Sequence, residues 1–161
     1  MMTVAIIFRP VHEEAGVGPG SGDGFVTEKV TTLYQAIGGD PVVRALTHRF
    51  YALMDRLPEA RNVRAVHPPS LTGSEEKFYE YMSGYLGGPP LYTDKRGHPR
   101  LRSRHFVAEI GPVERDEWLL CFRRALDETI ASQALRDLIW PPVERLAYHM
   151  QNKASDNKEQ P

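Results

Sequence analysis

Apolar side chains recur at steps of three and four residues from Asp40 to Leu57, and this pattern limits the possible folds most strongly. Such spacing places the side chains on one face of an α-helix. Asp40 is a good helix cap and Pro41 suits the first helical position, so we expect the helix to start there. Its length would be about 17 residues. The expected buried face consists of Val43, Leu46, Phe50, Met54 and Leu57.

Glycine and proline divide the rest of the chain into further helical segments. A threonine at position 31 or 32 can cap a short helix, which Gly38-Gly39 then ends. Thr72-Gly73-Ser74-Glu75 predicts a capping box, in which Thr72 accepts from the backbone and Glu75 reaches back. The helix that follows should run to Leu86. Because no β-type alternation of useful length occurs, the predicted fold class is all-α.

The remaining expected elements are more weakly marked. They are a helical turn and corner over 58–69, a loop over 89–98, a short helix ending near His105, a long helix from Pro112 to about Ile130, and a helical region over about 132–150. In the long helix Leu119, Phe122, Leu126 and Ile130 form the expected core face. Pro141-Pro142 should kink or split the last region, because proline cannot donate a helical hydrogen bond.

Length indicates a single domain, and the net charge excludes two classes of partner. A chain of 161 residues suits a single domain that can enclose a cofactor-sized cavity. We expect a glycine-rich flexible arm over 1–30, the folded domain over 31–151 and a polar tail over 152–161. Twenty basic and twenty-one acidic residues give a formal net charge of -1, which favours neither nucleic acid nor membrane as a partner.

Cysteine content and hydropathy indicate a cytoplasmic protein. The single cysteine, Cys121, excludes an internal disulfide and a multi-cysteine zinc site, and core packing is its expected role. The apolar run Val4 to Phe8 is shorter than a signal-peptide core, and no segment approaches the length of a membrane span. The glycines over 12–24 match neither GxGxxG nor a phosphate loop, so no nucleotide site is expected.

Of the six histidines, two remain as candidates for chemistry. His12 and His149 lie near the ends, and His48 should be solvated. Proline follows His98 and restricts it to extended geometry, so His98 should shape a loop. His98 and His105 are seven residues apart, too far for both to chelate one zinc ion, and no HExxH occurs. The spacing alone leaves the roles of His67 and His105 open.

A longer motif adds to this interpretation. The segment 91–121 reads LYTDKRGHPRLRSRHFVAEIGPVERDEWLLC, in which GHPRLRSRH precedes ERDEWLLC. This wording resembles the truncated haemoglobins, the short two-over-two globins, and within them the second group. The resemblance continues through LYQAIGG at 33–39, RFY at 49–51, LTGS at 71–74 and YLGGP at 85–89, and covers roughly Thr32 to Ile130.

The resemblance implies a two-over-two helical sandwich around a b-type haem. His105 matches the family's iron ligand. Tyr51, His67 and Trp118 match the distal side, where polar hydrogens stabilise a bound diatomic molecule. Ser74 would leave a route for ligands and Phe78 would narrow the site, while Lys77, Tyr92 and Arg104 would meet the propionates. Two departures stand out: Phe106-Val107-Ala108 replaces the usual x-Pro-Phe, and His67 stands where relatives carry tyrosine or histidine.

The function implied is binding and transport of oxygen, and binding of carbon monoxide and nitric oxide, at a pentacoordinate or weakly hexacoordinate iron. Nitric-oxide dioxygenation or peroxide reduction would need an electron donor, because the chain has no flavin or nicotinamide motif. Whether the protein is an enzyme is left open, as is a monomeric or homodimeric state. The alternative is a cofactor-free helical interaction module in which Tyr51, Phe78 and Trp118 only fill the core. A haem-based sensor is a third reading, but 161 residues leave no output domain.

Overall fold

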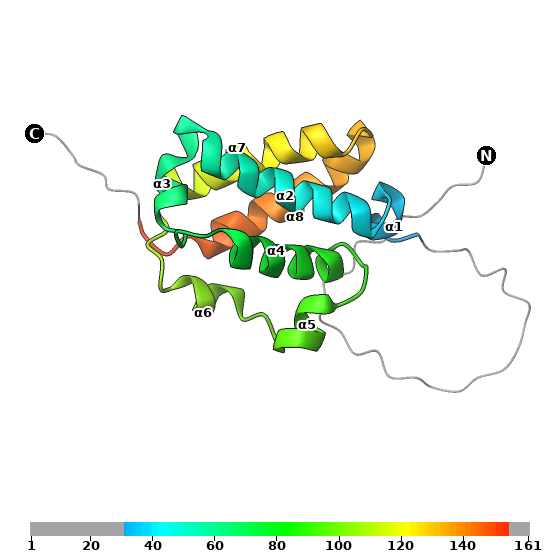
Figure 1. Ribbon diagram of the computed structural model, residues 1–161, viewed down its shortest axis with the longest axis horizontal. Helices are drawn as coiled ribbons and strands as arrows, with labels where there is room; N and C mark the ends of the chain where they lie inside the picture. The colour runs from blue at the N-terminus through cyan, green and yellow to red at the C-terminus, as the bar shows by residue number, and fades with distance from the viewer. Residues whose placement is uncertain (1–30, 155–161) are drawn as a thin grey trace, which may run out of the picture.

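The computed structural model describes residues 31–154, and these residues form eight α-helices and one short 3-10 helix without any β-strand (Figure 1). The all-α prediction is therefore confirmed. The elements are α1 (Leu33–Ile37), α2 (Asp40–Arg56), η1 (Pro58–Ala60), α3 (Arg61–Ala65), α4 (Thr72–Tyr85), α5 (Leu91–Arg96), α6 (Leu101–His105), α7 (Pro112–Thr129) and α8 (Gln133–Met150).

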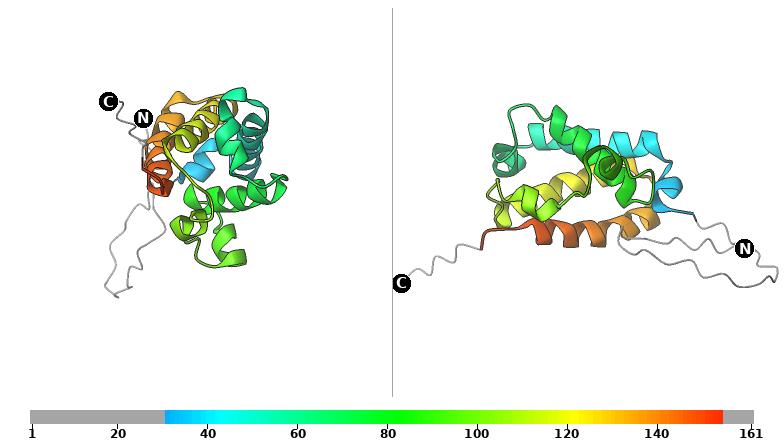
Figure 2. Two further views of the ribbon diagram at one scale, coloured as in Figure 1. Left: turned by 90° about the vertical axis from the view of Figure 1, so that its left-hand side faces the viewer. Right: turned by 90° about the horizontal axis from the view of Figure 1, so that it is seen from below.

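Four long helices make up the framework. α2 packs against both α4 and α7, and α7 packs against α8. The short helices α5 and α6 lie below this framework in Figure 1 and in the left view of Figure 2. α5 contacts α4, while α6 contacts α8, so the two short helices are attached to different members of the framework.

The core lies where α2 crosses α7, and both predicted apolar faces are found there. Val43, Leu46, Phe50 and Met54 are buried on α2, as are Leu119, Phe122, Leu126 and Ile130 on and just after α7. The rings of Phe50 and Phe122, both fully buried, have centroids 6.2 Å apart. Burial of one such side chain stabilises the fold by about 1.5–3 kcal/mol. This crossing fixes the helices that carry the candidate site residues Tyr51 and Trp118.

The first helix has the predicted caps. The Thr32 hydroxyl oxygen accepts from the Gln35 backbone N–H, and the Gln35 side chain accepts from the Thr32 N–H, at 3.2 Å each. Gly38 then has φ 113°, a left-handed conformation that glycine adopts without strain. The residue that caps α1 is thus Thr32 rather than Thr31.

Two other predicted caps are wrong. Asp40 is the first residue of α2 and Gly39 takes the cap position. The Asp40 carboxylate instead accepts from Arg44 and from the Tyr79 hydroxyl, which draws it away from the helix end. Likewise Thr72 lies inside α4 and Leu71 precedes the helix without a side-chain cap. Glu75 bonds His48 at 3.1 Å, so it does not reach back to close a capping box.

The segment predicted as a loop over 89–98 contains a helix, α5. Its last two residues meet Glu80 of α4, whose side chain is 2% exposed: Lys95 Nζ lies 2.6 Å and Arg96 Nε 2.5 Å from the carboxylate. These contacts keep the pKa of Glu80 below its usual value, chiefly through the hydrogen bond from Arg96. A partner 15 and 16 residues earlier, rather than local propensity, therefore holds α5 in place.

The proline pair does not split the last helix, because α8 continues through Pro141 and Pro142. Ile139 and Val143, on either side of the pair, are buried in the core. Packing therefore compensates for the hydrogen bonds that proline cannot donate. Ser132 caps the start of α8 by accepting from the Leu135 N–H.

Asn152 joins the end of α8 to the loop that follows α6. Its side-chain amide donates to the carbonyl oxygens of His105 and Ala108, at 3.1 and 2.8 Å, and its Oδ1 accepts from the Ile110 N–H at 3.0 Å. Of the predicted polar tail, 155–161 lies outside the described residues, as does the predicted arm over 1–30.

No helix between residues 31 and 154 is long and apolar enough to cross a membrane. Cys121 is buried, as expected for a packing residue, and burial raises the pKa of its thiol to about 11.

Candidate functional site

His105 is the last residue of α6 and is half-buried. Its Nδ1 lies 2.6 Å from the carbonyl oxygen of Leu101, one turn earlier. Because a carbonyl oxygen only accepts hydrogen bonds, Nδ1 carries the proton and Nε2 of the neutral ring keeps its lone pair. This is the arrangement in which histidine ligates a metal, with the second nitrogen fixing the tautomer. The bond from Asn152 to the His105 carbonyl also holds the backbone at this residue.

His67 follows α3 and is held in the same way. Its Nδ1 lies 2.7 Å from the carbonyl oxygen of Val63, so its Nε2 is also an acceptor in the neutral ring. Burial lowers the pKa of His67; the bond to the Val63 carbonyl opposes this effect, and the charge of Arg64 lowers the pKa further. His67 is therefore neutral at pH 7, and its Nε2 accepts rather than donates.

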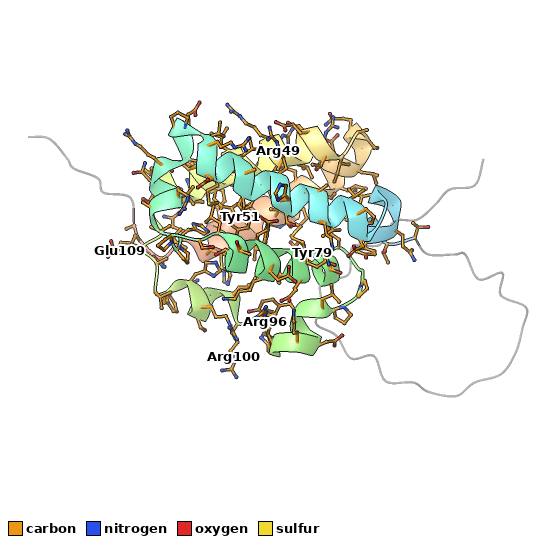
Figure 3. The ribbon with its side chains drawn as sticks, viewed as in Figure 1. Arg49, Tyr51, Tyr79, Arg96, Arg100 and Glu109 are labelled. Atoms are coloured by element: carbon orange, nitrogen blue, oxygen red, sulfur yellow. The ribbon has the colours of Figure 1, made fainter. Side chains whose placement is uncertain are left out.

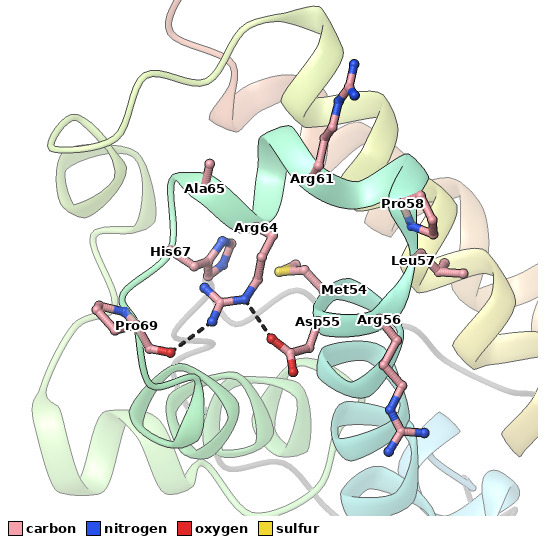
Figure 4. Close-up of a pocket in the computed structure, with 10 residues that line it drawn as sticks. All are labelled: Met54, Asp55, Arg56, Leu57, Pro58, Arg61, Arg64, Ala65, His67 and Pro69. Carbon is pink, nitrogen blue, oxygen red and sulfur yellow. Dashed lines mark hydrogen bonds and ion pairs between the residues drawn. The ribbon is translucent and has the colours of Figure 1, made fainter.

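Arg64 clamps the corner that carries His67 (Figure 4). Its Nε donates to Asp55 at 2.9 Å, and its two terminal nitrogens donate to the carbonyl oxygens of Pro68 and Pro69 at 3.0 and 2.8 Å. One guanidinium thus joins the end of α2 to the corner. A surface cavity of about 680 Å³ opens beside it and reaches Met54 and His67, but its lining includes neither His105 nor Trp118.

Aromatic side chains from α2, α4 and α7 meet around Phe50. The Phe78 ring lies 6.1 Å from Tyr51 and 5.7 Å from Trp118, measured between centroids. Trp118 stacks on Phe122 at 5.4 Å, with 9° between the planes. The Tyr51 ring is 5.9 Å from that of His67. The structure therefore brings Tyr51, His67, Phe78 and Trp118 together, as the sequence predicts.

Two polar hydrogens in this cluster have no acceptor among the described residues. Tyr51 is 7% exposed and lies on α2 beside α4 (Figure 3), and its hydroxyl forms no hydrogen bond with any residue over 31–154. Burial raises the pKa of Tyr51 far above its usual value, so the phenol keeps its proton. The Trp118 indole N–H also has no acceptor among the described residues. Both groups are therefore free to donate to a bound polar ligand.

The remaining predicted residues lie around this cluster. Ser74 is half-buried on α4, one turn before Phe78, and Lys77 between them is exposed and forms no ion pair within the described part of the chain. Tyr92 of α5 is buried, and the exposed Arg104 guanidinium lies 5.9 Å from the centroid of its ring. Tyr92 and Arg104 thus meet, whereas no ion pair, hydrogen bond or ring contact joins either of them to Lys77.

Comparison with known proteins identifies the family. The profile of the family described as "Bacterial-like globin" matches residues 32–152. The chain is a group II truncated haemoglobin. It is 34% identical over 120 residues to the group 2 truncated hemoglobin YjbI of Bacillus subtilis, a match that covers 74% of this chain and 88% of that protein.

Two solved structures confirm the two-over-two fold of this truncated haemoglobin. The group II 2-on-2 hemoglobin of Agrobacterium tumefaciens has 68% sequence identity and a TM-score of 0.76, with 79% of this chain and 98% of that chain covered. The cold-adapted truncated hemoglobin of Pseudoalteromonas haloplanktis has 36% identity and a TM-score of 0.74, with 76% and 99% covered. A truncated haemoglobin binds oxygen through a haem, so the family favours the haem-binding prediction over the cofactor-free module.

The residues of this truncated haemoglobin fit such a group. A neutral imidazole with a free Nε2 suits an iron, and unpaired donors on Tyr51 and Trp118 suit a ligand that carries partial negative charge. The departure at 106–108 has a structural counterpart: Phe106 and Val107 are 61% and 94% exposed, so neither packs in the core.

Sequence reasoning missed two residues that support the site of this truncated haemoglobin. Glu117 of α7 accepts from the Asn62 side chain at 2.6 Å and from the Val63 N–H at 2.8 Å. It thereby places a carboxylate at the start of α3, the helix whose Val63 holds His67. Asn152 supports His105 in a similar way. Their partners lie more than 40 residues away in sequence, so no local pattern could reveal them.

Proposed function

We propose that this protein binds a b-type haem through Nε2 of His105 and holds oxygen tightly on the side of the cluster formed by Tyr51 and Trp118. The haem iron would supply reversible binding of oxygen, carbon monoxide and nitric oxide. The observation that carries the proposal is the 2.6 Å contact between His105 Nδ1 and the Leu101 carbonyl oxygen, which reserves the other nitrogen for a metal.

Tyr51 and Trp118 would retain the ligand. Their O–H and N–H groups have no described acceptor, and a hydrogen bond to a charged acceptor contributes about 1.5–3 kcal/mol. Each donor should therefore slow the escape of oxygen by roughly tenfold to a hundredfold. Such retention suits storage or redox use of oxygen better than transport.

His67 would act as an acceptor beside these donors. With Nδ1–H directed to Val63, its Nε2 can accept from the Tyr51 hydroxyl or from water, but it cannot donate to the ligand while neutral. Its role would be to orient the Tyr51 proton. Whether His67 donates to the ligand depends on its tautomer, and the bond to the Val63 carbonyl favours the tautomer that does not.

The edge of the haem would be held by cations. Lys77 and Arg104 are exposed and form no ion pair within the described residues, so both are available to propionate carboxylates. The Tyr92 ring lies 5.9 Å from the Arg104 guanidinium. Ser74 would leave space for ligand access, and Phe78, in contact with Tyr51 and Trp118, would keep water from the site.

Redox turnover is a second part of the proposal. Nitric-oxide dioxygenation and peroxide reduction both consume electrons, and the sequence has no flavin or nicotinamide motif to supply them. A separate electron donor would therefore be required. The cytoplasmic location and the monomeric or homodimeric state remain predictions.

A haem titration tests the proposal. The purified protein should bind haem at a ratio of one to one, and the ferrous form should be pentacoordinate and bind carbon monoxide. If the protein takes up no stoichiometric haem, the cofactor-free helical module becomes the better interpretation.

A further inference from the structure

The segment just before His105 is strongly basic. Between residues 95 and 104 the chain has five lysines and arginines and no acidic residue, in a protein whose net charge is -1. Lys95 and Arg96 are engaged by the buried Glu80. The other three, Arg100, Arg102 and Arg104, are exposed and have no ion pair among the residues described. Glu109, the next acidic residue along the chain, is itself paired with Lys153 at 2.7 Å.

Exposed apolar residues adjoin these arginines. Phe106 is 61% and Val107 94% exposed, which makes them the two most exposed large apolar side chains in the described range. The Arg102 guanidinium lies 6.0 Å from the centroid of the Phe106 ring. We call Arg100, Arg102, Arg104, Phe106 and Val107 the α6 surface. Figure 3 shows Arg100 directed away from the four long helices.

The composition of the α6 surface is that of a protein interface. Arginine and aromatic residues are enriched in protein interfaces, whereas a solvated surface gains nothing from an exposed phenylalanine and valine. Three unpaired guanidinium groups favour a partner with carboxylates, because opposite charges steer the encounter and pair on contact. Even if Arg104 is occupied by a propionate, Arg100 and Arg102 remain available.

The position of the α6 surface indicates what the partner does. It consists of α6, which carries the proposed iron ligand His105, and of the residues on either side of this helix, so a redox protein bound there would be close to the iron. On the basis of the proposed function, turnover needs an external electron donor. We infer that the α6 surface is the docking site for an acidic electron-donor protein. Electron-transfer complexes of this kind are small and transient, so binding should weaken strongly with salt.

The test uses the haem-loaded protein and a reduced plant-type ferredoxin, a small acidic carrier, as the probe. Wild type is compared with the double variant Arg100→Glu, Arg102→Glu. The matched control is Arg56→Glu, Arg61→Glu, which makes the same charge change at two exposed arginines beside the 680 Å³ cavity, on other elements. Both the rate of haem reduction and the dissociation constant of the complex are measured as a function of ionic strength.

In wild type, reduction should be fast at low salt and slow down as salt is added. The double variant at the α6 surface should be at least about tenfold slower at low salt and should lose most of its salt dependence, while the control stays within about threefold of wild type. The dissociation constant should follow the same order. Phe106→Ala should weaken binding with less effect on the salt dependence.

Three results would overturn the inference. They are a wild-type rate that does not depend on salt, equal losses in the two double variants, or a change of oligomeric state in the α6 variant, which would assign the surface to a second copy of this chain. Carbon monoxide binding, measured for every variant, distinguishes failure of the docking inference from failure of the proposed haem-binding function. If all variants bind carbon monoxide normally and both double variants bind the ferredoxin with the same dissociation constant, only the inferred docking site is wrong.

Discussion

The carbonyl oxygen of Leu101 lies 2.6 Å from Nδ1 of His105 within one short helix. The same relationship recurs between Val63 and His67 at 2.7 Å. In each case the backbone fixes the tautomer and leaves Nε2 as the free nitrogen. The two rings nevertheless have different surroundings, since Tyr51 lies beside His67 and offers an unpaired hydroxyl. His105 is thus suited to ligating a metal, and His67 is suited to orienting the hydroxyl proton of Tyr51.

The Tyr51 hydroxyl should control how long oxygen stays bound. Tyr51→Phe removes the donor and leaves the ring, so oxygen should dissociate about tenfold to a hundredfold faster. Dissociation of carbon monoxide should change less, because that ligand carries little charge. Stopped-flow displacement measures both rates. Tyr148→Phe, at a ring that is 52% exposed near the end of α8, is the control and should leave both unchanged. Equal rates in wild type and Tyr51→Phe would show that Tyr51 only fills the core.

The free energy of unfolding should decrease as the pH is lowered below neutrality, and His67 should cause part of this decrease. Burial is the main cause of its lowered pKa, so the unfolded chain takes up this proton at a higher pH than the folded one. The stability that neutral His67 contributes is therefore fully present above the ordinary histidine pKa of about 6.5. It is lost as the pH falls from that value to the lower pKa of the folded state. The slope due to one group is at most about 1.4 kcal/mol per pH unit.

Urea unfolding of the haem-loaded protein between pH 5 and 7 measures this slope. His67→Phe should reduce it, whereas His149→Gln, at an exposed residue of α8, should not. An unchanged slope in His67→Phe would mean that the folded protein does not keep this imidazole neutral.

Much of the fold follows from local sequence, and what does not follow depends on distant partners. The helices α2 and α7 are found because Phe50 and Phe122 belong to regular apolar patterns, which arise within one helix. α5 is missed because Glu80, on another helix, holds it. Pro141-Pro142 does not split α8 because the core around it is well packed, and sequence does not show how strong that packing is.

The candidate site likewise contains residues that the sequence indicates and contacts that it does not. The motif at 97–105 points to His105, and the resemblance to the truncated haemoglobins points to Tyr51 and Trp118. The atoms that orient the two histidines are backbone carbonyls of Leu101 and Val63, and these are present in any sequence. Their effect depends on the geometry of the helix ends, which only a structure provides.

Arg64 should stabilise the corner that positions His67. Arg64→Met removes its bonds to Asp55 and to two carbonyl oxygens, and we expect a loss of about 1 kcal/mol, since the side chain is 25% exposed. Arg61→Met, at an exposed neighbour on the same cavity, should cost less than about 0.5 kcal/mol. Urea unfolding compares the two. Equal effects would mean that the clamp in Figure 4 adds no stability.

The visible spectrum of His105→Gly tests the central claim most directly. Wild type loaded with haem should show a strong Soret band that shifts when carbon monoxide binds the ferrous form. In His105→Gly the spectral signature of a histidine ligand should be lost, and added imidazole should restore it by filling the space left by the side chain. If the variant keeps the wild-type spectrum without imidazole, His105 is not the iron ligand and the account is wrong.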